Sequence, residues 1–188
     1  MNTIDQLQRE AEAAQDRLRA ALAALPAEPV KDYEFKAAGC GAPVTLSQLF
    51  GGRRDLWIVH NMGRKCAYCT LWADGFAGLY HHLADRAAFV LCTPDDPATA
   101  AAFASSRRWP FPVVCIGGTT FGRDMGFESA KGGVLPGISA FHRDEAGTIT
   151  RVRRSQQLGP GDPFNPVWPL LDLLKDGAAG WEPKFHYS

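Results

Sequence analysis

The sequence predicts an α/β fold in which helices flank a mixed central sheet. Apolar, strand-like runs alternate with helical patterns as far as residue 125, which is typical of parallel βαβ units. Two further strand-like runs follow, joined by the turn sequence Asp144-Glu145-Ala146-Gly147, and this arrangement predicts an antiparallel hairpin. A Cys-x-x-Cys pair, Cys66 and Cys69, stands where one apolar run gives way to a helix.

Residues 1–28 are expected to form a helical arm and a linker. Thr3 and Gln6 match a capping box at the start of a helix over residues 3–25, which Pro26 ends. Its apolar residues recur in a seam that needs a partner surface, namely Ile4, Leu7, Ala11, Ala14, Leu18, Ala21 and Leu25. The partner is either the chain's own domain or a second subunit. The sequence favours a homodimer only weakly, because alanines make a weak coiled coil.

Residues 29–177 are expected to form one domain, with residues 178–188 as a tail that packs through its aromatic residues. Strands are predicted at residues 30–36, 55–60, 87–92, 111–116, 136–143 and 148–154. Helices are predicted at 46–50 (behind a capping box of Thr45 and Gln48), from the Cys pair to 83, and at 98–108, 119–125 and 166–175. The last helix is expected to bury Val167, Trp168, Leu171 and Leu174.

The Cys pair carries the predicted chemistry. At the first turn of a helix, unpaired N–H groups and their partial positive charge favour a thiolate over a thiol. Arg64 and Lys65, just upstream, are expected to lower the pKa of Cys66 further. The second sulfur, one turn into the helix, can attack a mixed disulfide formed on the first. We interpret Cys66 as the attacking thiol and Cys69 as the resolving thiol.

Two other interpretations of the pair were weighed. A structural zinc site needs four ligands, usually as two close pairs, whereas Cys40, Cys92 and Cys115 each stand alone. No metal and no cofactor is therefore expected. The stronger competitor is a fold that keeps the two cysteines without using them.

Composition excludes several classes of function. The chain has 20 basic and 20 acidic residues, so it has no net field to attract nucleic acid or an anionic membrane. It contains no apolar run long enough to span a membrane and no signal-peptide core. Five cysteines, mostly far apart, argue against a secreted disulfide framework and for a reducing compartment. We expect a cytoplasmic protein.

Several other residues near the pair receive a structural interpretation. Trp72 is expected to pack in the core, and Asp74 to cap or to face solvent. His60, at the end of the strand before the pair, could take a proton from Cys69, although most such histidines are simply hydrogen-bonded in place. The basic runs Arg107-Arg108 and Arg151–Arg154 are expected to be solvated.

The order of these elements resembles the thioredoxin-like fold. The segment before the central strand, with Thr45-Leu46-Ser47-Gln48-Leu49-Phe50 and Gly51-Gly52, resembles the branch shared with peroxiredoxins and membrane-tethered thiol reductases. Residues 66–76 (CAYCTLWADGF), 82–86, 108–112 and 136–141 are similar to a bacterial thioredoxin-like family known only as a domain of unknown function. This similarity spans roughly residues 5 to 175.

The resemblance implies a substrate groove opposite the cysteines. Thioredoxin-like proteins place a cis-proline there, and Pro136 holds the matching position. A cis bond would turn the backbone groups of Leu135 outward to pair with a substrate strand, whereas a trans-proline would simply open a strand. The long gap from Cys69 to Pro136 indicates an insertion over residues 117–135. Tyr68 is expected to form an aromatic lip over the site.

The sequence departs from well-characterised relatives at the site. Peroxiredoxins carry Thr or Ser three residues before their reactive cysteine, where this chain has Gly63, so peroxide reduction is disfavoured. We therefore hypothesise a thiol–disulfide oxidoreductase that acts on a protein or small-molecule disulfide and is restored by an external thiol reductant. The alternative is a redox-silent thioredoxin-like binding or scaffold protein.

Overall fold

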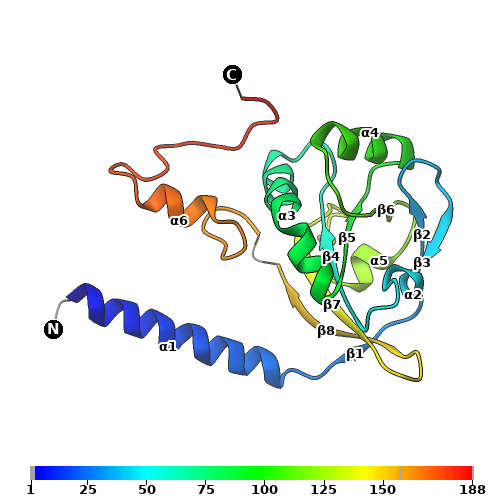
Figure 1. Cartoon of the computed structure of the whole chain (residues 1–188), viewed down its shortest axis with the longest axis horizontal. Helices are drawn as coiled ribbons and strands as arrows, with labels where there is room; N and C mark the ends of the chain where they lie inside the picture. The colour runs from blue at the N-terminus through cyan, green and yellow to red at the C-terminus, as the bar shows by residue number, and fades with distance from the viewer. Residues whose placement is uncertain (1–2, 157, 188) are drawn as a thin grey trace.

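A single mixed sheet organises the molecule. In the computed structural model, which describes residues 3–156 and 158–187, the sheet has eight strands in the order β1-β8-β7-β4-β5-β6-β2-β3 (Figure 1). At its centre β4 (Asp55–His60) pairs in parallel with β5 (Ala88–Thr93), which pairs in parallel with β6 (Val113–Cys115). The hairpin strands β7 (Gly137–Arg143) and β8 (Ile149–Ser155) add antiparallel pairs beside β4. The mixed sheet that the sequence predicted is confirmed.

Helices cover both faces of the sheet and enclose two cores. On one face α3 (Ala67–Arg86) and α4 (Pro97–Arg107) pack Trp72, Phe76 and Ala100 against the strands. On the other face α2 (Leu46–Leu49) and α5 (Phe121–Asp124) lie over a core that contains several phenylalanines. The predicted capping box of Thr45 and Gln48 opens α2. Burial on both faces explains why β4 and β5 read as nearly continuous apolar runs.

The strand predicted over residues 30–36 is wrong in its extent, because the chain there passes between opposite sides of the sheet. β1 (Glu28–Pro29) pairs with β8 at one edge, whereas β2 (Glu34–Ala37) pairs with β6 and with β3 (Pro43–Thr45) near the other. The edge strand β3 was not predicted. It is short and begins with Pro43, and such a residue is tolerated only at an edge or a strand start.

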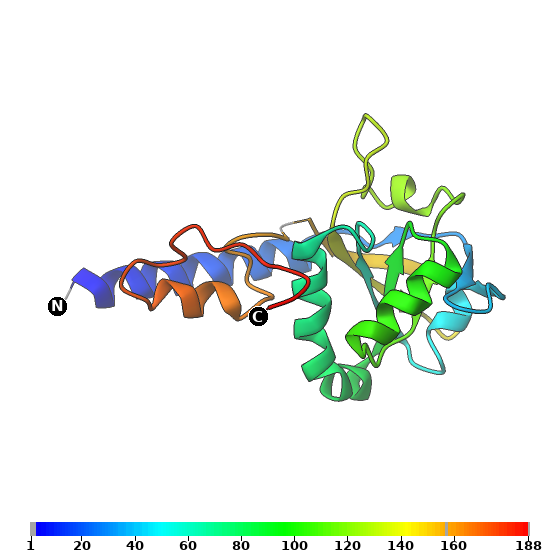
Figure 2. The ribbon, with the colours of Figure 1, turned by 90° about the horizontal axis from the view of Figure 1, so that it is seen from above.

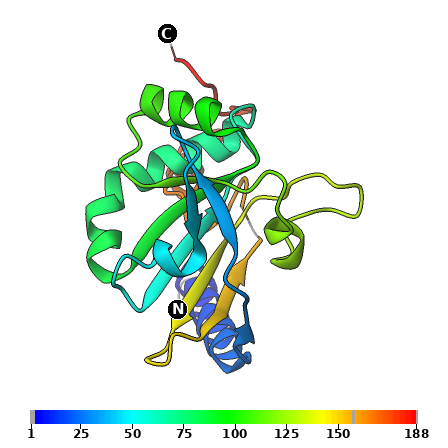
Figure 3. The same cartoon turned by 90° about the vertical axis from the view of Figure 1, so that its right-hand side faces the viewer.

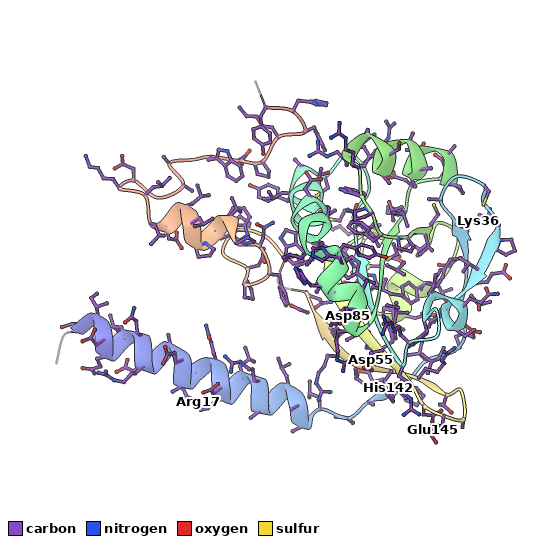
Figure 4. All side chains as sticks on the ribbon, viewed as in Figure 1. Arg17, Lys36, Asp55, Asp85, His142 and Glu145 are labelled. Carbon is purple, nitrogen blue, oxygen red and sulfur yellow. The ribbon has the colours of Figure 1, made fainter. Side chains whose placement is uncertain are left out.

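The N-terminal helix α1 (Thr3–Ala24) stands clear of the sheet (Figures 1 and 2). In the described structure it buries none of its residues. Figure 4 shows its side chains, Arg17 among them, extending from a helix that stands apart from the sheet. Its last turn is fixed to β8, because the Arg153 guanidinium donates to the carbonyls of Ala23 and Leu25 at 2.6 and 3.2 Å. The arm is therefore held at its C-terminal end.

Arg151 corrects the expectation that the basic run on β8 is solvated. Its side chain is buried and donates to Glu28 of β1 at 2.5 Å and to the Met125 carbonyl at 2.6 Å. A buried guanidinium needs such partners, because an unpaired buried charge is costly. Arg151 thus ties the strand that follows the arm to the segment after α5.

The C-terminal helix is shorter and more exposed than predicted. α6 (Val167–Asp172) buries Trp168, but Leu174 lies beyond its end and is 58% exposed. Leu170 and Leu173 are also exposed. Figure 2 shows why: α6 extends from the same side of the body as α1 and does not lie on the sheet. Its apolar spacing is therefore not matched by a core in this chain.

The segment between β6 and β7, where the sequence predicted an insertion over residues 117–135, contains a short helix and a loop. The short helix is α5, and the loop projects from the body in Figure 3. The loop closes on itself through a bridge between Glu128 and Val134.

Asp55 is the first residue of β4. Its carboxylate lies 2.8 Å from Nδ1 of His142 in β7, and Figure 4 labels both side chains.

Candidate functional site

The site lies at the carboxyl end of the central strand β4. After His60 the chain leaves the sheet through a turn in which Gly63 has φ of +96°, a conformation that favours glycine. The Asn61 side chain braces this turn, since its oxygen accepts from the Gly63 N–H at 2.7 Å and its amide donates to the Cys69 carbonyl at 3.5 Å. Helix α3 begins immediately afterwards, so both cysteines are presented at the edge of the sheet.

Cys66 is the N-cap of α3. Its sulfur accepts the backbone N–H of Cys69 at 3.1 Å, as the side chain of a helix N-cap normally does. A hydrogen bond from the Cys69 thiol lowers the pKa of Cys66 to about 6, and the backbone N–H groups of Cys69 and Tyr68 act in the same direction against partial burial. The site therefore contains one half-buried thiol that ionises below neutral pH.

Cys69 has the opposite character. It is buried in the first turn of α3, and its pKa is raised by the hydrogen bond with Cys66 and by desolvation. The proton that it holds is the one that stabilises the neighbouring thiolate. Both cysteines are free thiols. They lie within one helical turn, yet the pKa of Cys66 is lowered and that of Cys69 is raised.

Arg64 and Lys65 stand next to Cys66 in the chain, and both side chains are exposed. The Arg64 backbone N–H donates to Asp95 at 2.8 Å, which fixes the turn. The hydrogen bonds with Cys69 and Tyr68 lower the pKa of Cys66, and a contribution from these two cations stays a prediction. Local hydrogen bonds have the larger effect because exposed charges are screened by solvent.

His60 is buried beside the site on the opposite face of the strand from α3. Its Nε2 lies 2.9 Å from the Ser139 hydroxyl, its Nδ1 lies 3.5 Å from the Cys92 sulfur, and its ring stacks on Phe127. Burial lowers the pKa of His60 to about 3. A neutral histidine held by these partners supplies no positive charge to Cys66, and its hydrogen bonds direct it away from the role of a base for Cys69.

A cavity of about 270 Å³ opens beside the two sulfurs. It lies between the end of β4, the start of α3 and the loop after β8. Its walls combine the two cysteines with apolar and aromatic side chains and two polar ones: Val59, His60, Asn61, Met62, Cys66, Tyr68, Cys69, Trp72, Pro136, Leu158, Gly159 and Pro160. Of the residues predicted at the site, Cys66, Cys69, His60, Tyr68 and Pro136 line this cavity.

Leu135 and Pro136 enter β7 in an ordinary conformation. The described residues contain no cis peptide bond, so the expected cis bond before Pro136 is wrong. The Leu135 N–H donates to the Phe127 carbonyl at 2.9 Å, and this bond closes the projecting loop so that the chain reaches the strand in the lower-energy trans form. Leu135 is 36% exposed and is not among the residues of the cavity wall.

One carboxylate in the loop after β8 holds the outer wall of the cavity. Asp162 is buried and accepts the indole N–H groups of Trp72 and Trp168, each at 2.8 Å. It also accepts the backbone N–H groups of Phe164 and Asn165. Tyr68 stacks on Trp168 at 6.3 Å between ring centroids. Sequence analysis missed Asp162, because it lies in a Gly- and Pro-rich loop 90 or more residues from Trp72.

Asp74, expected to cap or to face solvent, and Arg107, expected to be solvated, are both in a cluster of paired side chains. The Asp74 carboxylate accepts the Arg107 guanidinium and, at 2.8 Å, the Trp109 indole N–H. Arg107 also donates to the Phe185 carbonyl at 2.7 Å, and the pairing raises the pKa of Arg107. This cluster joins α3, α4 and the C-terminal tail behind the site.

Neither a metal centre nor a membrane span is present in the described part of the chain. No group of three or more His, Cys, Asp and Glu side chains there could hold a metal ion. None of its helices is long and apolar enough to cross a bilayer.

Comparison with known proteins identifies the fold. The structure is similar to peroxidoxin BcpB from Mycobacterium tuberculosis (TM-score 0.54, 24% identity, 65% of this chain and 80% of that one). It is similar to PrxQ from Xylella fastidiosa (0.57, 14%, 71% and 86%) and to a hypothetical protein from Sinorhizobium meliloti (0.54, 12%, 86% and 88%). The chain thus has a thioredoxin-like fold, as these structures do.

The sequence itself matches one family. Residues 4–183 match a family of bacterial proteins of unknown function, DUF899. No curated protein matches the chain.

Proposed function

Because this chain belongs to DUF899, a bacterial family of unknown function, no reaction follows from its family, and we propose from the site itself that it is a thiol–disulfide oxidoreductase. The observation that carries the proposal is the unequal pair at the start of α3. Cys66 has a lowered pKa and accepts hydrogen bonds, while the pKa of Cys69 is raised largely by its bond to Cys66. The thioredoxin-like fold is consistent with this chemistry.

The first step uses the Cys66 thiolate. It attacks one sulfur of the substrate disulfide, and a bond forms between Cys66 and that sulfur while the substrate S–S bond breaks. The other substrate sulfur leaves as a thiolate and takes a proton from water. A thiol that is largely ionised at neutral pH is suited to this attack.

The second step uses Cys69, whose acidity changes once the first has occurred. In the mixed disulfide the Cys66 sulfur carries no charge, so the bond that held the Cys69 proton is lost and the pKa of Cys69 falls. Cys69 then attacks the Cys66 sulfur, forms the intramolecular disulfide and releases the second substrate sulfur as a thiolate, which takes up the proton. The two electrons come from the dithiol, and an external thiol reductant restores it.

The proposed substrate is a disulfide on a protein or a small molecule, and the proposed compartment is the reducing cytoplasm, where free cysteines persist. All five cysteines are free thiols. The redox-silent alternative predicts no reaction at the pair, so it is an outcome of the same test.

The test compares cysteine variants in a Cys40→Ser background, which removes the exposed cysteine outside the site. We expect this background protein to reduce insulin disulfides in the presence of a thiol reductant. Cys69→Ser should accumulate a mixed disulfide on Cys66, which intact-mass measurement detects, and Cys66→Ser should be inactive. Unchanged insulin reduction by Cys66→Ser would refute the assignment, and an unreactive background protein would favour a binding role.

A further inference from the structure

The cavity beside the cysteines provides information about the substrate. It has a volume of about 270 Å³, and both Cys66 and Cys69 form part of its wall. A group attached to a sulfur bonded to Cys66 would therefore lie next to this cavity. Sites that enclose part of a ligand select for the chemistry of their walls.

Apart from the Cys66 thiolate, no charged side chain lines this cavity in the described structure. Its wall includes the apolar and aromatic side chains of Met62, Tyr68, Trp72 and Leu158. The two polar side chains in the wall already have partners: His60 bonds to Ser139, and Asn61 bonds to Gly63 and Cys69. In the mixed disulfide the Cys66 sulfur carries no charge, so an ionised group held here would lose its hydration and find no counter-charge, which is strongly unfavourable.

The cations near the pair face a different surface. Arg64 and Lys65 border a separate, shallower groove with Phe103 and Phe185. An anionic substituent could approach these exposed side chains, but solvent and salt screen charges at such positions. The cavity therefore favours an apolar substituent, whereas the exposed cations favour an anionic one. At moderate salt the attraction to the cations is screened, so the cavity has the larger effect on which substrate reacts.

We propose that the substrate disulfide carries an uncharged, apolar substituent that occupies the cavity during attack by Cys66. This inference rests on the proposed function and specifies its substrate class. Glutathione disulfide, whose substituents bear carboxylates and ammonium groups, is then a poor substrate. The substituent belongs either to a small molecule or to an apolar side chain beside a protein cysteine.

The test uses mixed disulfides in which one sulfur carries a 2-pyridyl leaving group and the other carries a butyl, benzyl, carboxyethyl or aminoethyl group. The Cys66 thiolate attacks the sulfur bearing the variable group, and pyridine-2-thione is released and followed by its absorbance. Rates are measured with the reduced Cys40→Ser protein at 0.5 M salt, where the Debye length is only a few ångström. Each rate is divided by that of a small free thiol, which removes intrinsic reactivity.

We expect the normalised rates for the butyl and benzyl compounds to exceed both charged compounds by about tenfold or more, as for one or two buried methylenes in an apolar pocket. A second arm uses peptide 2-pyridyl disulfides with the cysteine beside Leu or beside Glu. If the preference for apolar groups is found only among the small compounds, the natural substrate is a small-molecule disulfide. If the preference is found only among the peptides, the natural substrate is a protein disulfide. Equal rates in both arms overturn the inference.

A variant pair tests whether the cavity is responsible. Leu158→Glu places a carboxylate on its wall and should reduce the preference for benzyl over aminoethyl at least tenfold. Leu173→Glu, on the exposed face after α6, should leave the preference unchanged. If Leu158→Glu does not fold, the wild-type rates still decide. If Cys66 reacts with none of the compounds, the proposed function fails, whereas reaction with all of them equally refutes the cavity inference alone.

Discussion

The amide N–H of Cys69 donates to the sulfur of Cys66 at 3.1 Å, so the Cys66 side chain caps the helix in which Cys69 lies. The same residue also contributes the thiol hydrogen bond that is the largest cause of the lowered pKa of Cys66. One residue thus stabilises the thiolate twice, through its backbone and through its side chain. These two contributions can be separated by substitution, because the backbone N–H remains when the side chain is changed.

Alkylation of Cys66 by iodoacetamide should follow a titration curve with a midpoint near pH 6. Cys69→Ala removes the thiol donor but keeps the backbone N–H. Since a hydrogen bond to a charged group contributes about 1.5–3 kcal/mol, the midpoint should rise by about one to two pH units. The measurement is the alkylation rate against pH in the Cys40→Ser background. A midpoint near 8.5 in the protein that keeps Cys69, which is the pKa of a free thiol, would contradict the hydrogen bonds described at the Cys66 sulfur.

The buried His60 should make the fold sensitive to acid. In the unfolded chain a histidine binds a proton below about pH 6.5, but in the folded protein burial lowers the pKa of His60 to about 3. The unfolded state binds more protons in this window, so the free energy of unfolding should fall as the pH is lowered from about 6.5 towards 3, by up to about 1.4 kcal/mol per unit. Urea unfolding at several pH values measures the slope, which His60→Gln should reduce. An unchanged slope in the variant would assign the acid sensitivity to other groups.

Asp162 should contribute to the free energy of unfolding through its hydrogen bonds to the Trp72 and Trp168 indoles. Asp162→Ala leaves two buried indole N–H groups without their acceptor, and each such loss costs about 1–3 kcal/mol. We expect the free energy of unfolding, measured in urea, to fall by about 2–4 kcal/mol. Asp172→Ala, at an exposed carboxylate of α6, is the matched control and should change it by less than about 0.5 kcal/mol.

Gly137, the first residue of β7, should tolerate no side chain. A Cβ there would overlap the ring of Phe127 and lie 2.5 Å from the Ser155 carbonyl oxygen. Gly137→Ala is expected to cost about 3 kcal/mol or more. Gly78→Ala is the matched control, since a Cβ at this position of α3 has nothing within 4 Å, and it should stabilise the helix by about 0.5–1 kcal/mol. Thermal unfolding should move in opposite directions for the two variants.

The N-terminal arm should associate with a second copy of the chain. An isolated helix is marginally stable in water, yet α1 spans 22 residues and leaves Leu7 and Leu18 more than half exposed. We expect the full chain to sediment as a dimer, and a chain that begins at Leu25 to sediment as a monomer with an unchanged Cys66 alkylation rate. Leu18→Glu should weaken the dimer, whereas Leu79→Glu, at an exposed position of α3, should not. A full chain that remains monomeric at high micromolar concentration would contradict this prediction.

Local patterns were sufficient to predict much of the fold. The apolar run 55–60, the helix start at the Cys pair and the hairpin turn after Arg143 each depend on neighbours in the chain, and the structure has all of them close to their predicted positions. The crossing of residues 30–33 from β1 to β2, where one continuous strand over 30–36 was expected, was not predictable in this way. Whether Glu28 and Glu34 join opposite sides of a sheet depends on where β8 and β6 lie, which is a property of the whole fold.

The same limit explains the missed polar residues. Asp74, Arg107 and Arg151 have the residue types of a solvated surface, and only distant partners make them structural: Trp109, Phe185 and Glu28 lie 35, 78 and 123 residues away from them. The resemblance to thioredoxin-like proteins placed Pro136 near the cysteines, but the cis bond that it implied there is absent from the structure. The chain instead enters β7 from a projecting loop in which the Leu135 N–H donates to the Phe127 carbonyl, a contact between residues that a simple alternation of strands and helices does not contain.

The capping role of the Cys66 sulfur has a consequence for the redox equilibrium. A sulfur that shares its electrons in a disulfide is a poorer acceptor than a thiolate, so oxidation would weaken the hydrogen bonds at the beginning of α3. The reduced protein is thereby favoured over the oxidised one, and the midpoint potential moves to a more positive value, as for oxidants whose dithiol form is stabilised. A helix that begins on a charged sulfur thus makes the pair a better acceptor of electrons than an uncapped pair would be.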